Sequence, residues 1–288
     1  MKIAEAGGLW FAALRRRRRS EKTIEWYAMW LRDLSRSLML ARPLGFDDVA
    51  HVSLADLRAW VDGLTARGLK PHSIHGAARA ARAFFRWCLA EGLRADDPTL
   101  RLERPDLPRR IPKPLPVDVV QQLINVAAGS THAARDQALV MFLADTGVRL
   151  GELCGLQVGD VDLAGCSAVV VGKGDQERFV FFSDETRRAL MAWLVVRPPG
   201  VGNLFGLGYY AVGGLLRRLA DRACVAERVH PHAFRKTAAT RYAEQLDPHA
   251  LMQLFGWKQL QTSEHYVYHS RARLAARARA VLEARPTD

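Results

Sequence analysis

Apolar side chains recur at intervals of three and four residues through the first hundred positions, which is the spacing of one face of an α-helix. The pattern predicts a short helix or a loose arm over residues 1–14. Two further helices are expected to begin after the N-cap candidates Ser20 (or Thr23) and Ser53. The clearest helix covers residues 71–89. Its apolar face is formed by Ile74, Ala78, Ala81, Phe85 and Cys88. Together these segments predict a helical first domain.

A proline-rich segment separates this first part from the rest of the chain. Four of its prolines lie between positions 108 and 116, the last three at every second position, and each one fixes φ and removes a backbone donor. The segment therefore cannot form a regular helix and is expected to be an extended basic linker. The predicted organisation is a helical domain over residues 1–104, the linker over 105–116 and a second domain over 117–288.

The second domain changes from a helical pattern to short alternating runs and back. The predicted strands cover about residues 160–163, 168–171 and 179–182. The predicted helices cover about residues 117–127, 133–144, 149–156, 184–196, 211–224, 232–245, 248–255 and 270–284. Asp247, Pro248 and Gly256 carry the start and stop signals of one of these helices. Thr262 or Ser263 is expected to cap a further short helix. This domain is thus predicted to be mostly α, with a small antiparallel sheet.

The net charge of the chain indicates which kinds of molecule it binds. It carries 42 Lys and Arg against 30 Asp and Glu, a formal net charge of +12, and its isoelectric point is about 10.1. Such a field favours nucleic acid first and an anionic membrane surface second, with an ordinary soluble basic protein as the third interpretation. Arginine dominates over lysine, which suits bidentate contacts to phosphate.

Cysteine usage and hydropathy bear on the compartment. Cys88, Cys154, Cys166 and Cys224 are scattered without a CxxC pair, so they predict buried apolar thiols and neither a disulfide framework nor a zinc site. No apolar run approaches the roughly 18 residues that a spanning helix needs. We therefore expect a cytoplasmic protein without a membrane partner.

A stripe of basic residues follows the helix at 71–89. Its members lie three or four positions apart, so they share one helix face. They are His72, His75, Arg79, Arg82 and Arg86. No acidic residue interrupts the stripe. We interpret it as a surface that binds double-stranded DNA, with a solvated basic face as the alternative.

Six residues of the second domain have the side chains needed to hold a phosphodiester while a phenol attacks it. They are Arg149, Lys173, His232, Arg235, Trp257 and Tyr266. Guanidinium groups stabilise the negative charge that develops on the non-bridging oxygens. An imidazole can accept the phenolic proton, and an ammonium can protonate the leaving oxygen.

The motifs around these residues resemble those of tyrosine recombinases of the phage-integrase type, close in layout to Xer-type and transposon integrases. Four blocks in the family's order carry the resemblance, which covers nearly the whole chain. They are Thr146–Arg149 with Glu152, Gly172–Gly174 with Arg178, His232–Arg235 with Thr237, and Leu254–Trp257 with Tyr266. The resemblance implies a helical core-binding domain and a mostly α catalytic domain, which together form a clamp around DNA.

The resemblance also implies roles in the cleavage step. Arg149 and Arg235 would bind the scissile phosphate, although Glu152 could instead hold Arg149 in a structural ion pair. Tyr266 would attack as the nucleophile, and His232 would accept or share its proton. A capping or core histidine is the alternative for His232.

Two further positions have competing interpretations. Lys173, at the expected hairpin tip, would protonate the departing 5′ oxygen, or it is an ordinary exposed turn lysine. Trp257 would donate one hydrogen bond from its indole N–H, or it packs beneath the nucleophile. The nucleophile itself is assigned to Tyr266 by its spacing from Gly256. Tyr268 remains the alternative nucleophile. The family usually has a histidine two residues after the nucleophile, whereas this chain has Tyr268 two residues after Tyr266.

No metal and no nucleotide cofactor is expected. His265 and His269 have the i, i+4 spacing of a ligand pair, yet no third ligand is near in the sequence. The bond energy would be stored in a 3′-phosphotyrosine, so the resemblance implies no external energy source.

The resemblance implies a homo-tetramer on two paired DNA sites, formed from monomers or dimers off DNA. The C-terminal helix would dock on a neighbouring protomer, and a partner recombinase or accessory factor is also conceivable within the family. Two alternatives to a recombinase are a relaxing topoisomerase of type IB and a DNA-binding relative that has lost catalysis.

Overall fold

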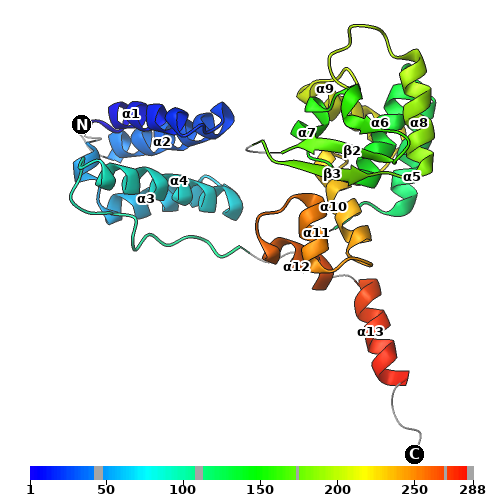
Figure 1. The fold of residues 1–288 in the computed structure, drawn as a ribbon. Helices are drawn as coiled ribbons and strands as arrows, with labels where there is room; N and C mark the ends of the chain where they lie inside the picture. Colours follow the sequence, from blue (N-terminus) through cyan, green and yellow to red (C-terminus); the bar gives the residue numbers. More distant parts are fainter. Residues whose placement is uncertain (42–47, 108–112, 173–174, 269–270, 284–288) are drawn as a thin grey trace, which may run out of the picture. The chain divides into compact units, whose positions relative to one another are not determined.

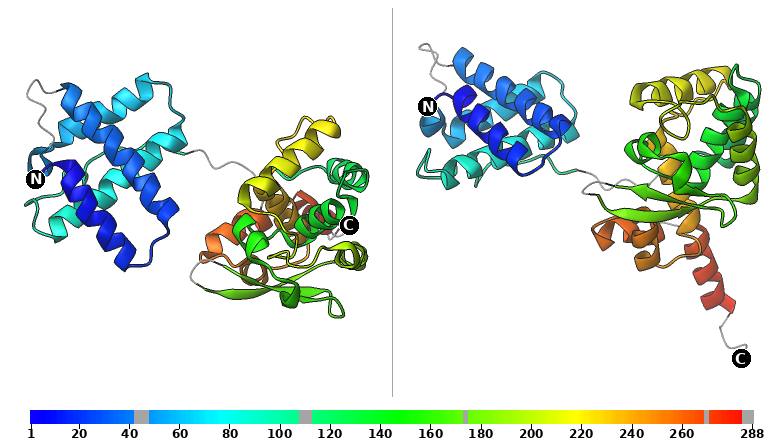
Figure 2. Two further views of the ribbon diagram at one scale, coloured as in Figure 1. Left: turned by 90° about the horizontal axis from the view of Figure 1, so that it is seen from above. Right: turned by 45° about the horizontal axis from the view of Figure 1, so that its top comes forward.

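The computed structural model describes residues 1–41, 48–107, 113–172, 175–268 and 271–283. The chain forms two compact units, Met1–Arg109 and Arg110–Asp288 (Figure 1, Figure 2). The division between them falls inside the proline-rich segment 105–116.

The first unit forms helices and no β-strand in the part that the structure describes, and its residues 91–107 are turns and irregular chain. Its elements are α1 (Ile3–Arg16), α2 (Glu21–Ala41), a 3-10 turn (Val49–His51), α3 (Leu54–Ala66) and α4 (Pro71–Ala90). The expected N-cap Ser53 is confirmed, since its Oγ accepts from the amide of Asp56 at 3.2 Å and the Asp56 carboxylate accepts from the Ser53 amide at 2.8 Å. α2 extends to Ala41, and Leu38 in its last turn is still buried in the core.

α4 supplies much of the core of this unit. The apolar face predicted for it is confirmed, and all five of its residues are buried. Phe84 and Phe85 are fully buried and lie edge to face, with ring centroids 5.2 Å apart. Burial raises the pKa of the Cys88 thiol to about 12, so this thiol is inert at neutral pH.

The second unit contains nine of the helices and all three strands that the described residues form (Figure 1). Its helices are α5 (Val117–Ala128), α6 (Ala133–Thr146), α7 (Leu150–Gly155), α8 (Asp184–Val196), α9 (Tyr209–Arg222), α10 (Pro231–Tyr242), α11 (Pro248–Phe255), α12 (Leu260–Tyr268) and α13 (Arg271–Glu283). Eight of the fourteen residues of α6 are buried and none is exposed, and the helix packs against α5, α8 and α10. This central helix ends beside the residues of the candidate site.

A small antiparallel sheet covers one side of the second unit, as predicted. Its strands are β1 (Val161–Asp162), β2 (Ser167–Val171) and β3 (Glu177–Phe181), in the order β1-β2-β3. The register pairs Ala168 with Val180, and both side chains are buried in the core. The neighbouring strand position Phe179 is exposed, as the two-residue period of a strand requires.

Two expectations for the C-terminal part need correction. α12 begins at Leu260, so neither Thr262 nor Ser263 caps it. Ser263 is fully buried inside the helix, and its Oγ donates to the carbonyl of Leu260 at 2.7 Å. Serine is favoured at the start of a helix, but Ser263 lies buried within α12, where its hydroxyl bonds to a backbone carbonyl.

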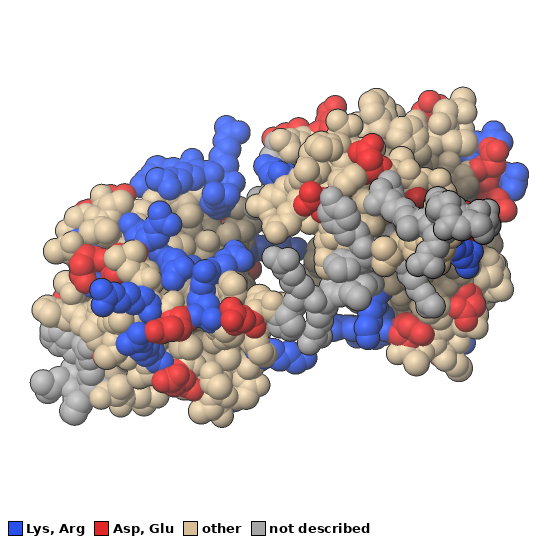
Figure 3. Space-filling view, turned by 90° about the horizontal axis from the view of Figure 1, so that it is seen from below, with Lys and Arg blue, Asp and Glu red and all other residues tan. Residues whose placement is uncertain are grey.

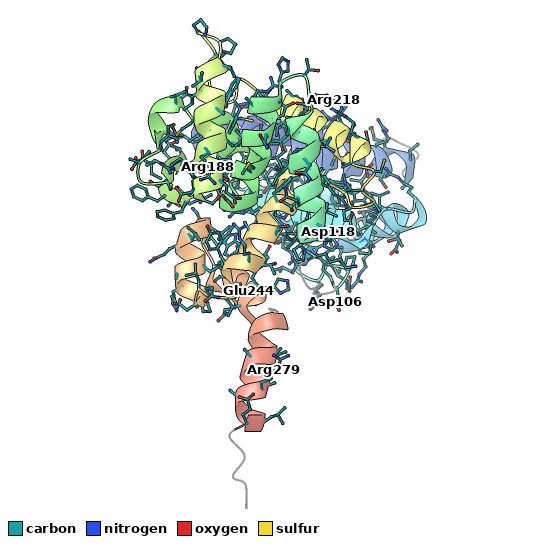
Figure 4. All side chains as sticks on the ribbon, turned by 90° about the vertical axis from the view of Figure 1, so that its right-hand side faces the viewer. Asp106, Asp118, Arg188, Arg218, Glu244 and Arg279 are labelled. Carbon is teal, nitrogen blue, oxygen red and sulfur yellow. The ribbon has the colours of Figure 1, made fainter. Side chains whose placement is uncertain are left out.

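The last helix, α13, carries the end of the described chain. Its described side chains are exposed, including Leu274, Leu282 and Arg279, the last of which is labelled in Figure 4. Across all the residues that the structure describes, none of the helices combines the length and the apolar character needed to span a bilayer.

Candidate active site

The candidate active site lies where α10, α11 and α12 meet the end of α6, beneath the sheet in Figure 1. Gly147 ends α6 in the left-handed conformation, with φ +57°. A Cβ at this position would lie 2.9 Å from both Ala238 and Phe255. Only glycine therefore allows α6 to end this close to α10 and α11.

Arg149 follows directly and is the N-cap of α7. Its Nη1 pairs with Glu152 at 2.7 Å, and its Nη2 donates to the carbonyl of Gly256 at 2.9 Å. The side chain nevertheless remains 41% exposed. The ion pair with Glu152 thus holds the guanidinium in place and leaves an outer edge open to an anion.

Arg235 is held more deeply, in the middle of α10. Only 4% of the residue is exposed. Its Nη1 donates to the carbonyl of Gly147 at 2.9 Å, and its Nη2 donates to the carbonyl of Phe255. Burial, and then the charges of Arg149 and Arg178, lower the pKa of Arg235 to about 9, which still leaves it positively charged at pH 7.

A buried carboxylate and a third arginine complete the charged cluster. Glu152, with a side chain 2% exposed, pairs with Arg178 at 2.6 Å as well as with Arg149. Burial alone would raise the pKa of Glu152, but Arg178 and the hydrogen bonds from Arg149 outweigh it and lower the pKa. Sequence reasoning considered Glu152 only as a rival partner for Arg149 and gave Arg178 no role.

The C-terminal end of α11 ties the three arginines together. The consecutive carbonyls of Leu254, Phe255 and Gly256 accept from Arg178, Arg235 and Arg149 respectively. The last carbonyls of a helix lack intrahelical partners and carry a partial negative charge. Three arginines at this end supply hydrogen-bond donors to the carbonyls and also compensate the partial charge. Gly256, with φ +58°, lets the chain turn away immediately afterwards.

That turn places an aromatic stack beside the arginines. Trp257 stacks on Phe255, with centroids 5.0 Å apart and planes 19° apart, and on Tyr266, with centroids 5.2 Å apart and planes 9° apart. The guanidinium of Arg235 lies over the Trp257 ring at 5.6 Å. The packing interpretation of Trp257 is therefore what the structure shows.

Tyr266 is 9% exposed in this stack. Burial raises the pKa of its phenol above the ordinary value, and the positive charge of Arg235 opposes the shift only in part. The phenol is accordingly protonated at neutral pH. Arg235 connects it to the rest of the cluster, since this guanidinium reaches both the aromatic stack and the carbonyl of Gly147.

A hollow of about 340 Å³ opens over the arginines. It is lined by Val148, Arg149, Leu150, Tyr209, His230, Pro231, His232 and Arg235. His232 sits in the first turn of α10 and is exposed. Its pKa lies below the ordinary value, first through partial burial of the ring and then through nearby Lys236, His230 and Arg235. A neutral imidazole and two guanidinium groups thus face one anion-sized space.

The six predicted site residues fall into three groups. Arg149, His232 and Arg235 line the hollow, whereas Trp257 and Tyr266 are not among its lining residues; Trp257 contacts Arg235 and stacks on Tyr266. Lys173 lies outside the described residues, as do His269 and the side chain of Tyr268. No group of three potential metal-ligating side chains was found among the described residues.

The basic stripe of the first unit is divided by the structure. His72, Arg79 and Arg86 are exposed on α4. Arg82 is half-buried, and its Nη2 donates to the carbonyls of Thr99 and Leu102 at 3.2 Å each. Arg82 therefore holds the segment that follows α4.

The remaining member of the stripe, His75, is also half-buried. Burial, and then the charges of Arg104 and Arg79, lower its pKa. Figure 3 shows Lys and Arg side chains spread across one face of this unit, with acidic side chains among them. Arginines of this unit thus remain available to a polyanion even though the stripe is not uniform.

Comparison with known proteins covers both units. Residues 113–273 match the model of the phage integrase family, and residues 8–92 match the phage integrase N-terminal SAM-like domain. The chain is 31% identical over 247 residues to the tyrosine recombinase XerC of Xanthomonas campestris pv. campestris, which covers 82% of this chain and 76% of that protein.

Solved structures share the fold. The Tn1549 transposon integrase in complex with a circular intermediate DNA matches with a TM-score of 0.76 and 20% identity, over 98% of this chain and 99% of that one. A lambda integrase dimer bound to a core site matches with a TM-score of 0.71 and 18% identity, over 91% and 97% of the two chains.

Proposed function

Because the chain belongs to the phage integrase family and is a site-specific tyrosine recombinase acting on DNA, we propose that Tyr266 is its nucleophile. The Oη of Tyr266 attacks the scissile phosphorus, a new O–P bond forms, and the bond from phosphorus to the 5′ oxygen breaks. The products are a 3′-phosphotyrosyl protein and a free 5′ hydroxyl. Attack by a 5′ hydroxyl on this linkage reverses the step and rejoins DNA, so no cofactor supplies energy.

Arg149 and Arg235 bind the non-bridging oxygens of the phosphate in the hollow. The observation that carries this assignment is the way the guanidinium groups are fixed before any ligand arrives, by the end of α11 and by Glu152. Donors that are already oriented cost no reorganisation when charge develops in the transition state. Arg178 supports them as a positioning residue, since its side chain is 9% exposed and engaged by Glu152 and Leu254.

The proton of Tyr266 has to leave during the attack, because burial keeps the phenol protonated. His232 accepts or shares that proton, and its lowered pKa keeps the imidazole in the neutral form that this role requires. Lys173 protonates the departing 5′ oxygen. Trp257 orients the phenol by stacking on it, and its indole N–H can also donate to the phosphate.

Binding of the duplex involves both parts of the chain. Residues 1–104 act as the core-binding domain, 105–116 as the linker and 117–288 as the catalytic domain. His72, His75, Arg79, Arg82 and Arg86 form the helix face turned towards DNA, with the exposed Arg79 and Arg86 as the principal phosphate contacts. The lambda integrase neighbour is a dimer on DNA, and here we expect a homo-tetramer on two paired sites. Sedimentation with one or two sites per DNA fragment measures that assembly.

The decisive experiment traps the covalent intermediate. The protein is incubated with a nicked suicide DNA taken from the sequence flanking its gene, and adducts are resolved on a denaturing gel. We expect an adduct with the parent protein and with Tyr268→Phe, and none with Tyr266→Phe, which retains duplex binding. The reverse pattern would move the nucleophile to Tyr268. Tight binding without an adduct from any of the three proteins would point to a DNA-binding relative without catalysis.

A further inference from the structure

A second histidine lies in the hollow beside His232 and has a structural task that fixes its chemistry. His230 is the N-cap of α10, and its Nδ1 accepts a hydrogen bond from the amide of Ala233 at 3.2 Å. An N-cap needs an acceptor, and serine, threonine, aspartate and asparagine fill that position far more often than histidine. The capping role alone therefore does not require an imidazole.

The cap determines where the proton of this imidazole sits. A neutral imidazole has one donor and one acceptor nitrogen. Since Nδ1 accepts from Ala233, the proton is on Nε2. Burial, and then the charges of Arg228 and Lys236, lower the pKa of His230, which favours the same neutral form. His230 consequently presents a fixed N–H donor at the outer end of its ring.

The surroundings of that donor are those of the phosphate site. His230 lines the hollow together with Arg149, His232 and Arg235. The rings of His230 and His232 are nearly parallel, with planes 12° apart and centroids 6.4 Å apart. A hydrogen bond spans about 2.8 Å between heavy atoms. One phosphate seated in the hollow can thus meet donors from both rings.

We propose that His230 is a further substrate-contacting residue of the recombinase, whose Nε2–H donates a hydrogen bond to a non-bridging oxygen of the scissile phosphate. The proposal rests on the function assigned above to the same hollow. His232 accepts or shares the proton of Tyr266. His230 keeps its own proton and stabilises the negative charge that develops on the phosphate oxygen, as an oxyanion-hole donor does. One side chain thereby caps the helix with one nitrogen and binds substrate with the other.

Substitutions at position 230 separate the two nitrogens. His230→Ser retains a capping acceptor and removes the Nε2 donor, whereas His230→Ala removes both. His230→Thr serves as a second capping variant if the serine protein does not fold. Ser183→Ala, which removes the N-cap of α8 outside the hollow, is the matched control for loss of a cap. Each protein is assayed for Tm, duplex affinity and the single-turnover rate of adduct formation on saturating suicide DNA.

We expect His230→Ser to keep the parental Tm and to form the adduct about tenfold to a hundredfold more slowly, the loss typical of one donor to developing charge. His230→Ala should lose both Tm and rate, and Ser183→Ala should lose Tm while the folded protein reacts at the parental rate. A serine or threonine variant that reacts as fast as the parent would overturn the proposal. Absence of any Tyr266-dependent adduct with the parent would instead overturn the proposed function.

A second readout responds to contact with phosphate and not to helix stability. The two phosphorothioate diastereomers of the scissile linkage each replace one non-bridging oxygen by sulfur, which is a weak acceptor. The parent-to-serine ratio of rates should be smaller on the diastereomer that lacks the oxygen bound by His230. An equal ratio on both diastereomers and on the unmodified phosphate would contradict the contact.

Discussion

At the residue scale, the charge balance of the site depends on one buried carboxylate. Glu152 is the acidic group that pairs with both Arg149 and Arg178, and the charges of these two arginines also act on the buried Arg235. Removing one partner of a buried ion pair leaves an uncompensated charge, which is costlier than losing the attraction itself. Glu152 therefore allows three cations to be gathered at one end of a helix.

Glu152→Gln tests this balance. The amide retains hydrogen-bonding capacity but loses the charge, so we expect the free energy of unfolding to fall by about 3 kcal/mol in urea titrations. Adduct formation should fall as well, because Arg149 loses its anchor. The control is Glu185→Gln on the exposed side of α8, which should change stability by less than about 0.5 kcal/mol. Equal stability of the two variants would show that the carboxylate charge is dispensable.

The histidines of the hollow predict the pH dependence. The pKa values of His230 and His232 are lowered from an ordinary value of 6.5, so the folded state favours their neutral forms. The stability that the two neutral histidines give the folded state is fully present above pH 6.5. It is lost as the pH falls through the lowered pKa values of the folded protein. Activity should follow, because a protonated His232 cannot accept the phenolic proton.

The adduct rate, measured at constant ionic strength, should accordingly fall by up to about tenfold per pH unit in this acidic range. His232→Gln should be slower throughout and should have a flatter profile on the acidic side. A parental rate that stays constant down to the most acidic pH at which the protein remains folded would contradict the assignment of His232 as proton acceptor.

At the element scale, the helix ends carry the site. α6 ends at Gly147 and α11 ends at Gly256, both in the left-handed conformation, and the carbonyls of these two glycines accept from Arg235 and Arg149 respectively. A Cβ on Gly256 would lie 2.9 Å from Cδ of Arg178. The glycines that end these two helices thus also position the arginines of the candidate active site.

Gly256→Ala should cost about 1–2 kcal/mol in the free energy of unfolding from backbone conformation alone, and more from contact with Arg178. It should also slow adduct formation, since the carbonyl of this residue holds Arg149. Gly151→Ala in α7 is the matched control, because a Cβ there meets nothing within 4 Å and alanine favours a helix by up to about 1 kcal/mol. Thermal and urea unfolding of both variants measure the difference in stability between them. Equal changes in the free energy of unfolding would contradict the role given to Gly256.

At the scale of the whole molecule, the net charge of +12 suits a DNA partner, but single arginines differ in what they contribute. Arg79 and Arg86 are exposed on α4, whereas Arg82 is engaged by two backbone carbonyls. The stripe seen in the sequence therefore mixes exposed side chains with one that holds the backbone of its own unit.

Replacing Arg79 and Arg86 together by alanine should weaken duplex binding and leave Tm unchanged. The slope of log affinity against log salt concentration should become smaller by about 1.8, since each phosphate contact contributes roughly 0.9. Arg82→Ala should instead lower Tm, because two carbonyls lose their donor. Fluorescence anisotropy titrations across a range of salt concentrations measure the slope, and an unchanged slope in the double variant would place these arginines in solvent.

The sequence by itself determined the elements and the chemical inventory of this protein. Helix and strand patterns, the caps at Ser53 and Asp247 and the stop at Gly256 depend on near neighbours, so they can be read locally. Family motifs identified the two arginines, the histidine and the tyrosine without any coordinates. Where local reasoning failed, as at Ser263, burial against distant residues had overridden a local preference.

Only the tertiary structure decided how these groups work together. The contacts that fix the guanidinium groups join Arg149 to Gly256, Arg178 to Leu254 and Arg235 to Phe255, across 107, 76 and 20 positions of the chain. No periodicity records such distant pairings. The same holds for the stack of Trp257 on Tyr266, which depends on how α11 and α12 pack, and for the hollow that brings Arg149 to His230, His232 and Arg235. Contacts between near neighbours determine each element, and packing between distant elements brings the side chains of the candidate site together.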